Sequence, residues 1–306
     1  MSSLTLNNAS NYVGRFAPSP SGPLHFGSLV TALGSYLQAK SNDGKWLLRI
    51  EDIDPPREVA GASDCILSCL EAHQLFWDDS VVYQSQRSEL YADKIEWLHK
   101  HGFTYHCQCT RAELCQLSQG QICACVGLNL PALSHATRFN FSSPAIHFND
   151  QLLGKITFDQ TQLARQFAIR RKDGLFAYQL AVVVDDIQQG ITEVARGADL
   201  LSATAYQIAL YQAFDCAIPQ FLHFPVVVSE PGKKLSKQNH ASAVQNTAAA
   251  ANLVAALQFL GLLVPRELTG GAIADILGWA IDNWDLAKLV AKTERIDNRI
   301  AQQDSI

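Results

Sequence analysis

The sequence predicts an α/β protein built on a mainly parallel β-sheet. Short apolar runs alternate with stretches of helical periodicity along most of the chain, at the spacing of strand–helix–strand units. One of these runs, residues 180–184, is continuous rather than alternating, as expected of a strand buried on both faces of a parallel sheet. A chain of 306 residues suits about two domains of roughly 150 residues, or one α/β domain with an insertion.

The predicted elements follow this pattern on both sides of an irregular region. Before it we expect strands at 12–16, 46–50 and 81–83 and helices at 29–39, 65–75 and 88–101. After it we expect strands at 139–141, 145–148, 167–170, 180–184 and 224–228, a helix at 199–214, and only helices after position 242. The expected organisation is an N-terminal extension (1–11), an α/β core (12–106 and 140–240), a cysteine-rich insertion (107–139) and a helical C-terminal segment (241–306).

Composition and charge exclude several classes of protein. Apolar residues make up 48% of the chain, which excludes a disordered or collagen-like protein. The net charge of −5 leaves no overall positive field, so any contact with RNA or DNA must be local. The polar residues 1–11 do not resemble a secretory signal, and no segment reads as a bilayer span. We therefore expect a cytoplasmic monomer with no membrane partner, in which clustered cysteines are reduced.

The first candidate site is the loop that joins the first strand to the first helix. It is rich in proline and places His25, Gly27 and Ser28 at the entrance of the helix. Backbone N–H groups and the helix dipole favour phosphate at such a position, and Gly27 lets a ligand approach the backbone. The alternative is a turn in which His25 only caps the helix.

A second candidate site is a lysine-rich loop that follows the expected strand at 224–228. Lys234 and Lys237 are three residues apart, with Ser236 between them, and can neutralise the charge of a triphosphate. The alternative is a solvated loop without a ligand.

Taken together, the two loops resemble the paired H-I-G-H and K-M-S-K-S signatures of class I aminoacyl-tRNA synthetases. Further ordered motifs resemble the glutamyl-tRNA synthetase catalytic core: residues 15–22, 49–54, 83–87, 178–186 and 190–199. The resemblance implies a Rossmann-like class I synthetase fold. Ser28 departs from the H-I-G-H pattern, which has a second histidine there.

The chain stops about seventy residues after Lys237, so we expect no anticodon-binding domain. This shortened core resembles the glutamyl-Q tRNA(Asp) synthetase family. That resemblance implies activation of L-glutamate with ATP and Mg²⁺, then transfer of glutamate to queuosine in the anticodon of tRNA(Asp). The alternatives are a truncated synthetase that charges a 3′ end and an adenylate-binding regulatory module without transfer.

The residue chemistry agrees with a glutamate substrate. Its γ-carboxylate needs guanidinium donors, which Arg15 and Arg196 can supply, and its ammonium needs an acid such as Glu51. The resemblance also places Ala17, Ser19 and Tyr178 at the glutamate site. It places His25, Gly27, Ser28, Lys234, Ser236 and Lys237 at the ATP site, with His25 and Lys237 stabilising the transition state.

The cysteine-rich insertion contains two close pairs, Cys107 with Cys109 and Cys123 with Cys125. Four thiolates at this spacing can hold a structural Zn²⁺. The resembling family has Cys-x-Cys, a tyrosine and a further cysteine, but no tyrosine occurs here, so Cys115, Gln121 or Cys123 remains open as the fourth ligand. A reduced, metal-free cluster is the alternative.

Overall fold

The computed structural model describes residues 12–116, 121–141, 145–159, 162–164, 166–234 and 242–297. Ser236 and Lys237 lie outside these ranges, and for Lys234 only the backbone is described. None of the helices within the described ranges has the length and apolar character needed to cross a membrane.

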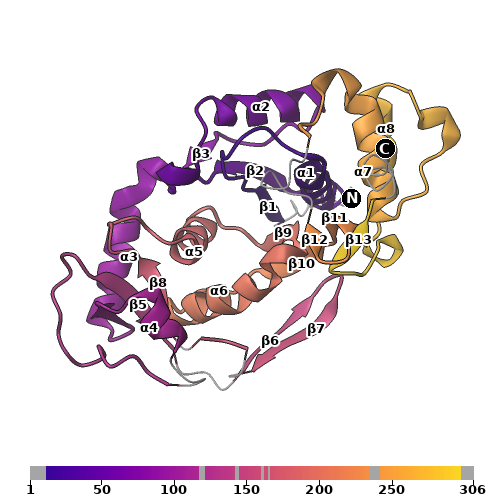
Figure 1. Ribbon diagram of the computed structural model, residues 1–306. Coiled ribbons are helices and arrows are strands. Elements are labelled where there is room, and N and C mark those ends of the chain that lie inside the picture. Colours follow the sequence, from indigo (N-terminus) through magenta and orange to yellow (C-terminus); the bar gives the residue numbers. More distant parts are fainter. Residues whose placement is uncertain are drawn as a thin grey trace, which may run out of the picture.

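The first part of the fold is a three-stranded parallel sheet in the order β1-β2-β3 (Figure 1). Its elements are β1 (Val13–Phe16), α1 (Phe26–Lys40), β2 (Lys45–Ile50), α2 (Ala62–Ala72) and β3 (Val82–Tyr83). Leu29, Leu33 and Leu37 recur every four residues and are all fully buried, so one face of α1 covers the sheet. The expected strand–loop–helix start of the chain is confirmed.

The second sheet has the order β7-β6-β10-β9, with β10 parallel to both of its neighbours. Its strands are β6 (Ala145–Asp150), β7 (Gly154–Asp159), β9 (Glu193–Gly197) and β10 (Gln220–Phe224), and α6 (Leu201–Ala213) connects the last two. The two sheets meet where the Thr192 amide donates to the Val13 carbonyl over 2.9 Å. Gly34 allows α1 to pack closely on β10, because an added Cβ would come within 2.7 Å of the Phe224 ring. The α/β class with parallel strands is confirmed.

The strand predicted at 180–184 is wrong, because these residues lie in α5 (Tyr178–Gln188). Every side chain from Leu180 to Asp186 is buried, so α5 has no solvent face that would impose a helical period on the sequence. A short, fully apolar run does not distinguish a buried helix from a buried strand.

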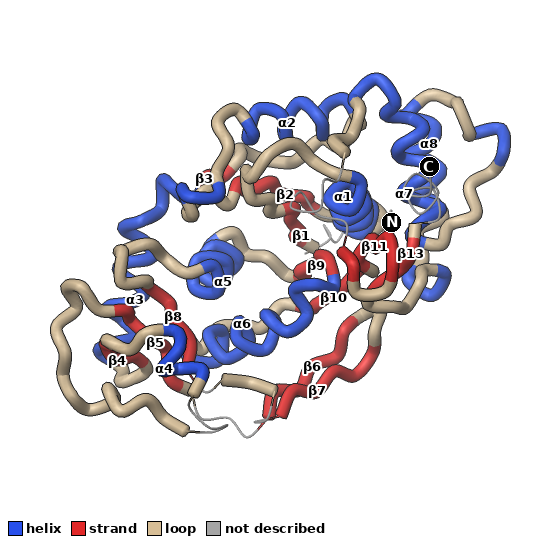
Figure 2. Tube along the Cα trace, viewed as in Figure 1, coloured by secondary structure: helices blue, strands red, loops and turns tan. Residues whose placement is uncertain are grey.

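An antiparallel sheet, β4-β5-β8, lies with α3 and α4 at one end of the molecule (Figures 1 and 2). The elements are α3 (Ser88–Lys100), β4 (Thr104–Cys107), α4 (Arg111–Cys115), β5 (Ala136–Asn140) and β8 (Gln166–Arg170). The expected limits of the insertion, 107 and 139, fall in β4 and β5, so this sheet joins the cysteine-rich segment to the rest of the chain.

The opposite end carries α7 and α8 with the sheet β12-β11-β13 (Figure 2). The elements are β11 (Val226–Glu230), β12 (Lys233–Lys234), α7 (Ala249–Leu260), α8 (Ile273–Asp282) and β13 (Glu294–Ile296). The single strand expected at 224–228 is two strands, β10 and β11, on either side of Pro225, which has no N–H for a ladder. The expectation of only helices after 242 is also wrong, since β13 pairs with β11; three residues are too few to show a period of two.

Short 3-10 turns complete the described fold. They lie at Pro55–Arg57, Gln84–Arg87, Ala198–Leu200, Asn246–Ala248, Arg266–Leu268 and Leu286–Lys288.

Candidate active site

A cavity of about 500 Å³ opens beside the ends of β1 and β2. Three of the expected glutamate-site residues line it: Ser19, Glu51 and Tyr178. The cavity therefore brings together residues from the loop after β1, the end of β2 and the start of α5. Ala17 lies half-buried directly after β1.

Arg196 of β9 is a buried guanidinium held by neutral groups. Its Nη1 donates to the Tyr178 hydroxyl over 3.3 Å, and its Nη2 donates to Thr204 and Gln207, each over 2.8 Å. Only 4% of the residue is exposed, and no ion pair to Arg196 occurs among the described residues. Burial lowers the pKa of Arg196, as expected of a cation without a direct counter-charge. Such a group favours an anionic ligand.

A buried histidine fixes the orientation of Arg196. Nε of Arg196 donates to Nε2 of His223 over 3.2 Å. Because Nε2 accepts this bond, the proton of the neutral His223 ring is on Nδ1, which donates to Asp150 over 2.6 Å. Burial lowers the pKa of His223, which keeps the ring neutral beside the guanidinium. Asp150 and His223 thus position Arg196 without cancelling its charge at close range.

Arg15 of β1 differs from Arg196 because two of its guanidinium nitrogens already bind a carboxylate of the protein. Its Nε and Nη2 donate to the two oxygens of Asp186 over 3.1 and 3.3 Å. Arg15 and Asp186 are both buried. Any contact between Arg15 and a substrate must therefore use the remaining part of the guanidinium.

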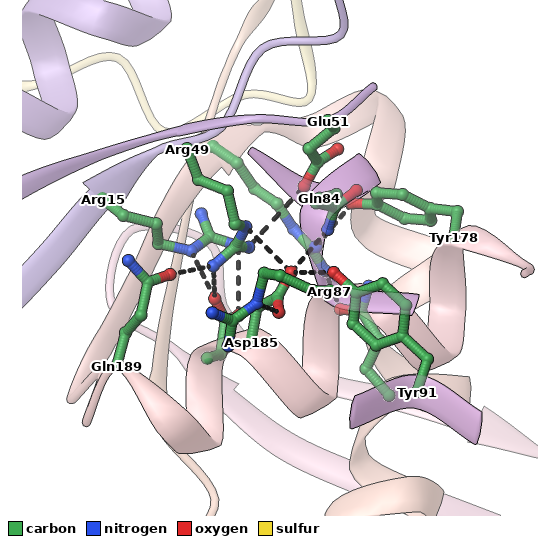
Figure 3. A network of polar contacts seen from close by, with 12 residues as sticks. Arg15, Arg49, Glu51, Gln84, Arg87, Tyr91, Tyr178, Asp185 and Gln189 are labelled. Atoms are coloured by element: carbon green, nitrogen blue, oxygen red, sulfur yellow. Dashed lines mark hydrogen bonds and ion pairs between the residues drawn. The ribbon is translucent and has the colours of Figure 1, made fainter. Parts of the chain in front are cut away.

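Arg49 of β2 is the centre of a buried ionic network (Figure 3). Its nitrogens lie 2.8 Å from Asp186, 3.6 Å from Asp185 and 3.6 Å from Glu51. Burial alone would lower the pKa of Arg49, but the three surrounding acids raise it above its usual value. Arg49 therefore stays charged and holds these acids together.

Asp185 accepts further hydrogen bonds from the segment that follows β3 (Figure 3). The donors are Nε2 of Gln84 at 2.7 Å, Nε of Arg87 at 2.6 Å and the Tyr91 hydroxyl at 2.8 Å. These bonds tie the cavity wall to α5.

Glu51 has an unusual pKa for a carboxylic acid. Burial raises the pKa to about 7, although Arg49 and Arg15 oppose the shift. A carboxyl group with this pKa changes charge near neutral pH and gains from a cationic ligand.

His25 is the N-cap of α1. Its Nδ1 accepts from the Ser28 amide over 3.2 Å, and the Ser28 hydroxyl lies 3.2 Å from its Nε2. A Cβ on Gly27 would approach the His25 ring to 3.2 Å. The backbone of His25 also forms an isolated bridge to Ala243.

The sulfurs of Cys107, Cys109, Cys123 and Cys125 lie within 4.8 Å of one another. The Cys109 and Cys123 sulfurs are 3.4 Å apart, and the pairs Cys107–Cys123 and Cys109–Cys125 are each 3.6 Å apart. These distances are near the roughly 3.8 Å between sulfurs that Zn–S bonds of ~2.3 Å produce in a tetrahedron. Burial raises the pKa of the Cys107 thiol to about 11, so a cation is needed to ionise the group. Cys123 takes the fourth position in this cluster. The side chain of Cys115 is outside the described residues.

Several residues that shape the site were absent from the predicted set. They are Arg49, Gln84, Arg87, Asp150, Asp185, Asp186, Thr204, Gln207 and His223. Asp185 and Asp186 end an apolar run, and His223 interrupts one, so a polar residue at a buried position was the available signal.

The parallel α/β sheet, the capped first helix and the ionic cavity agree with a catalytic domain of the class I tRNA synthetase type. Residues 12–126 and 132–268 match the family described as "tRNA synthetases class I (E and Q), catalytic domain", and the chain belongs to this family. It is therefore an enzyme of the ligase type.

Within this class the chain belongs to the family whose curated members are named glutamyl-Q tRNA(Asp) synthetase. The protein of that name from Photobacterium profundum is 51% identical over 287 residues, which cover 94% of this chain and 92% of the relative. The one from Serratia proteamaculans is 51% identical over 275 residues, 90% of this chain and 91% of the relative.

Solved structures agree with this membership. A glutamate tRNA ligase from Elizabethkingia meningosepticum, in complex with its amino acid, aligns with a TM-score of 0.77 at 26% identity and covers 96% of this chain and 68% of its own. A methionyl-tRNA synthetase from Mycobacterium tuberculosis aligns with a TM-score of 0.55 at 11% identity, covering 82% of this chain and 64% of its own, and so shares the fold.

Proposed function

We propose that the protein activates L-glutamate with ATP and transfers it to the queuosine base in the anticodon of tRNA(Asp). The observation that carries the proposal is the buried guanidinium of Arg196, whose direct partners among the described residues are all neutral and which contacts Tyr178 at the cavity. Glu51 lines the same cavity with a carboxyl group suited to an ammonium. A substrate with a carboxylate at one end and an ammonium at the other fits this pair.

In the first step the glutamate α-carboxylate attacks the α-phosphorus of ATP, and pyrophosphate leaves. A carboxylate is already a nucleophile at neutral pH, so positioning and charge neutralisation suffice. When bound, Mg²⁺ supplies counter-charge for the phosphates. We assign His25, Gly27, Ser28, Lys234, Ser236 and Lys237 to ATP, with His25 and Lys237 stabilising the transition state.

In the second step a hydroxyl of the queuosine cyclopentenediol attacks the carbonyl of glutamyl-adenylate, and AMP leaves. Incubation of tRNA(Asp) with labelled glutamate and ATP tests the proposal. Label on queuosine-containing tRNA but not on unmodified tRNA is expected. Label on both at the 3′ end would instead indicate a synthetase of the charging type, and glutamate-dependent pyrophosphate exchange without transfer would indicate a regulatory module.

We expect glutamate binding to depend on pH through Glu51. The ammonium of glutamate requires the ionised carboxylate, and with a pKa of about 7 this form predominates only above neutral pH. The KM for glutamate in pyrophosphate exchange should therefore be about tenfold higher at about pH 6 than at about pH 8. Glu51→Gln should raise KM and remove this pH dependence; an unchanged profile in the variant would contradict the assignment.

We propose that the four cysteines hold one structural Zn²⁺. Metal analysis of the purified protein should find about one zinc per chain. Cys125→Ser should lose the metal and lower the midpoint of thermal unfolding, whereas Cys216→Ser, outside the cluster, should retain it. A wild-type protein without zinc would refute the site.

We further propose that the turn after β8 contacts the tRNA. Arg171 lines the cavity and pairs with Asp54 over 3.3 Å, and the Lys172 ammonium binds the Gln108 carbonyl. Joint replacement of Arg171 and Lys172 by alanine should weaken transfer about tenfold or more while leaving pyrophosphate exchange nearly unchanged. An equal loss of both activities would contradict this assignment.

We propose that the enzyme acts as a monomer. A tRNA substrate places the reaction in the cytoplasm. Size-exclusion chromatography with light scattering tests the oligomeric state.

A further inference from the structure

Gln84 is a fully buried side chain in the wall of the cavity, on the 3-10 turn after β3. Figure 3 shows its amide in the same region as Glu51 and Tyr178, and all three residues line the cavity. One half of the amide is in use, because Nε2 donates to Oδ2 of Asp185 over 2.7 Å. The other half, Oε1, has no hydrogen-bond partner among the described residues.

The orientation of this amide follows from its partner. Asp185 forms ion pairs with Arg87 and Arg49, and a carboxylate in an ion pair only accepts hydrogen bonds. The NH₂ group of Gln84 must therefore face Asp185, and the carbonyl oxygen must face away from it. A buried carbonyl oxygen without a partner is unfavourable, so a ligand that donates to it gains the bond without having to break another.

The contact to Asp185 does not by itself explain why a glutamine is present. Asp185 already accepts from Arg87 over 2.6 Å and from the Tyr91 hydroxyl over 2.8 Å. An apolar residue at position 84 would leave Asp185 with these partners. What Gln84 adds is an oriented acceptor in the wall that also contains Glu51.

We propose that Gln84 is a further substrate-binding residue whose Oε1 accepts a hydrogen bond from the α-ammonium of glutamate, alongside the carboxylate of Glu51. The inference rests on the proposed function. An ammonium has more than one N–H to donate, and two neighbouring acceptors select it over a carboxylate, which would be repelled by both. Gln84 and Glu51 thus select the ammonium end of the substrate, and Arg196 and Tyr178 select the carboxylate end.

Two variants separate the acceptor from the contact to Asp185. Gln84→Met removes both the acceptor and one donor to Asp185, with little change in volume. Tyr91→Phe is the matched control, because it removes another neutral donor to the same oxygen of Asp185 and does not line the cavity. The readouts are the KM values for glutamate and for ATP in pyrophosphate exchange, together with the midpoint of thermal unfolding.

Gln84→Met should raise the KM for glutamate about tenfold to a hundredfold, the range of a hydrogen bond to a charged group, with little change in the KM for ATP. Tyr91→Phe should leave both KM values within about threefold of the wild type. An unchanged KM for glutamate, an equal rise in the KM for ATP, or the same rise in Tyr91→Phe would overturn the inference.

Gln84→Glu guards against a misfolded methionine variant. A glutamate side chain still presents an oxygen to the cavity but also sets a second carboxylate against Asp185. Gln84→Glu should therefore lower the midpoint of thermal unfolding, while its KM for glutamate stays below that of Gln84→Met; a KM equal to or above that of Gln84→Met would overturn the inference. Absence of glutamate-dependent exchange in the wild type would instead refute the proposed function, so the two failures are distinguishable.

Discussion

Replacement of Arg196 by methionine should lower kcat/KM for glutamate in pyrophosphate exchange about a thousandfold. Methionine removes the buried cation that we assign to the γ-carboxylate of glutamate, and a desolvated charge pair of this kind contributes about 2–5 kcal/mol. Arg196→Lys should recover little of the activity, because an ammonium cannot replace the planar fork that contacts Tyr178, Thr204 and Gln207.

Arg138→Met is the control for this experiment. Arg138 lies in β5 and donates to the Gln166 carbonyl, away from the cavity. Its replacement should change kcat/KM for glutamate by about threefold or less. Retention of activity within about tenfold in Arg196→Met would contradict the assignment of Arg196.

Replacement of Arg49 by methionine should lower the free energy of unfolding by about 3–5 kcal/mol at slightly alkaline pH. Arg49 is fully buried, and its loss leaves Glu51, Asp185 and Asp186 without the cation that they share. Urea unfolding followed by circular dichroism measures the change.

The effect of Arg49→Met should depend on pH in a defined direction. Burial already raises the pKa of Glu51 to about 7, and Arg49 is the main charge that opposes this shift. Without Arg49 the pKa of Glu51 rises further, so the folded variant binds more protons than the unfolded chain and its stability falls as pH rises through neutrality. The difference from the wild type should therefore shrink toward about pH 5. Arg57→Met is the control, since the Arg57 side chain is 71% exposed in its pair with Asp54 and exposed pairs contribute little. A loss below about 1 kcal/mol in Arg49→Met would contradict the role of Arg49.

The α/β class and most element positions could be predicted because amphipathic elements leave a period in the sequence. The face of α3 formed by Tyr91, Ile95 and Leu98, the buried residues of that helix, is an example. The failure at α5 has the opposite cause: the helix is buried from Leu180 to Asp186, so no exposed face marks its period. Pro225 separates β10 from β11. Because proline has no N–H for a strand ladder, its position in the sequence could have predicted two strands instead of one.

The predicted site residues were those at motif positions, and the structure shows what motif positions leave out. Ser19, Glu51 and Tyr178 meet at one cavity, as expected of a shared site. The orientation of Arg196, by contrast, depends on two buried partners, His223 and Asp150, which lie far from it in the sequence. Such pairings arise from tertiary contacts and leave no spacing pattern in the chain.

The central claim is that the activated glutamate goes to the anticodon and not to the 3′ end. The most direct measurement uses labelled glutamate and tRNA(Asp) that contains queuosine but lacks its 3′-terminal adenosine, with intact queuosine-free tRNA(Asp) as the counterpart. We predict that the truncated, queuosine-containing tRNA is labelled and that the intact, queuosine-free tRNA is not. The reverse result, label only where the 3′-terminal adenosine is present, would contradict the claim.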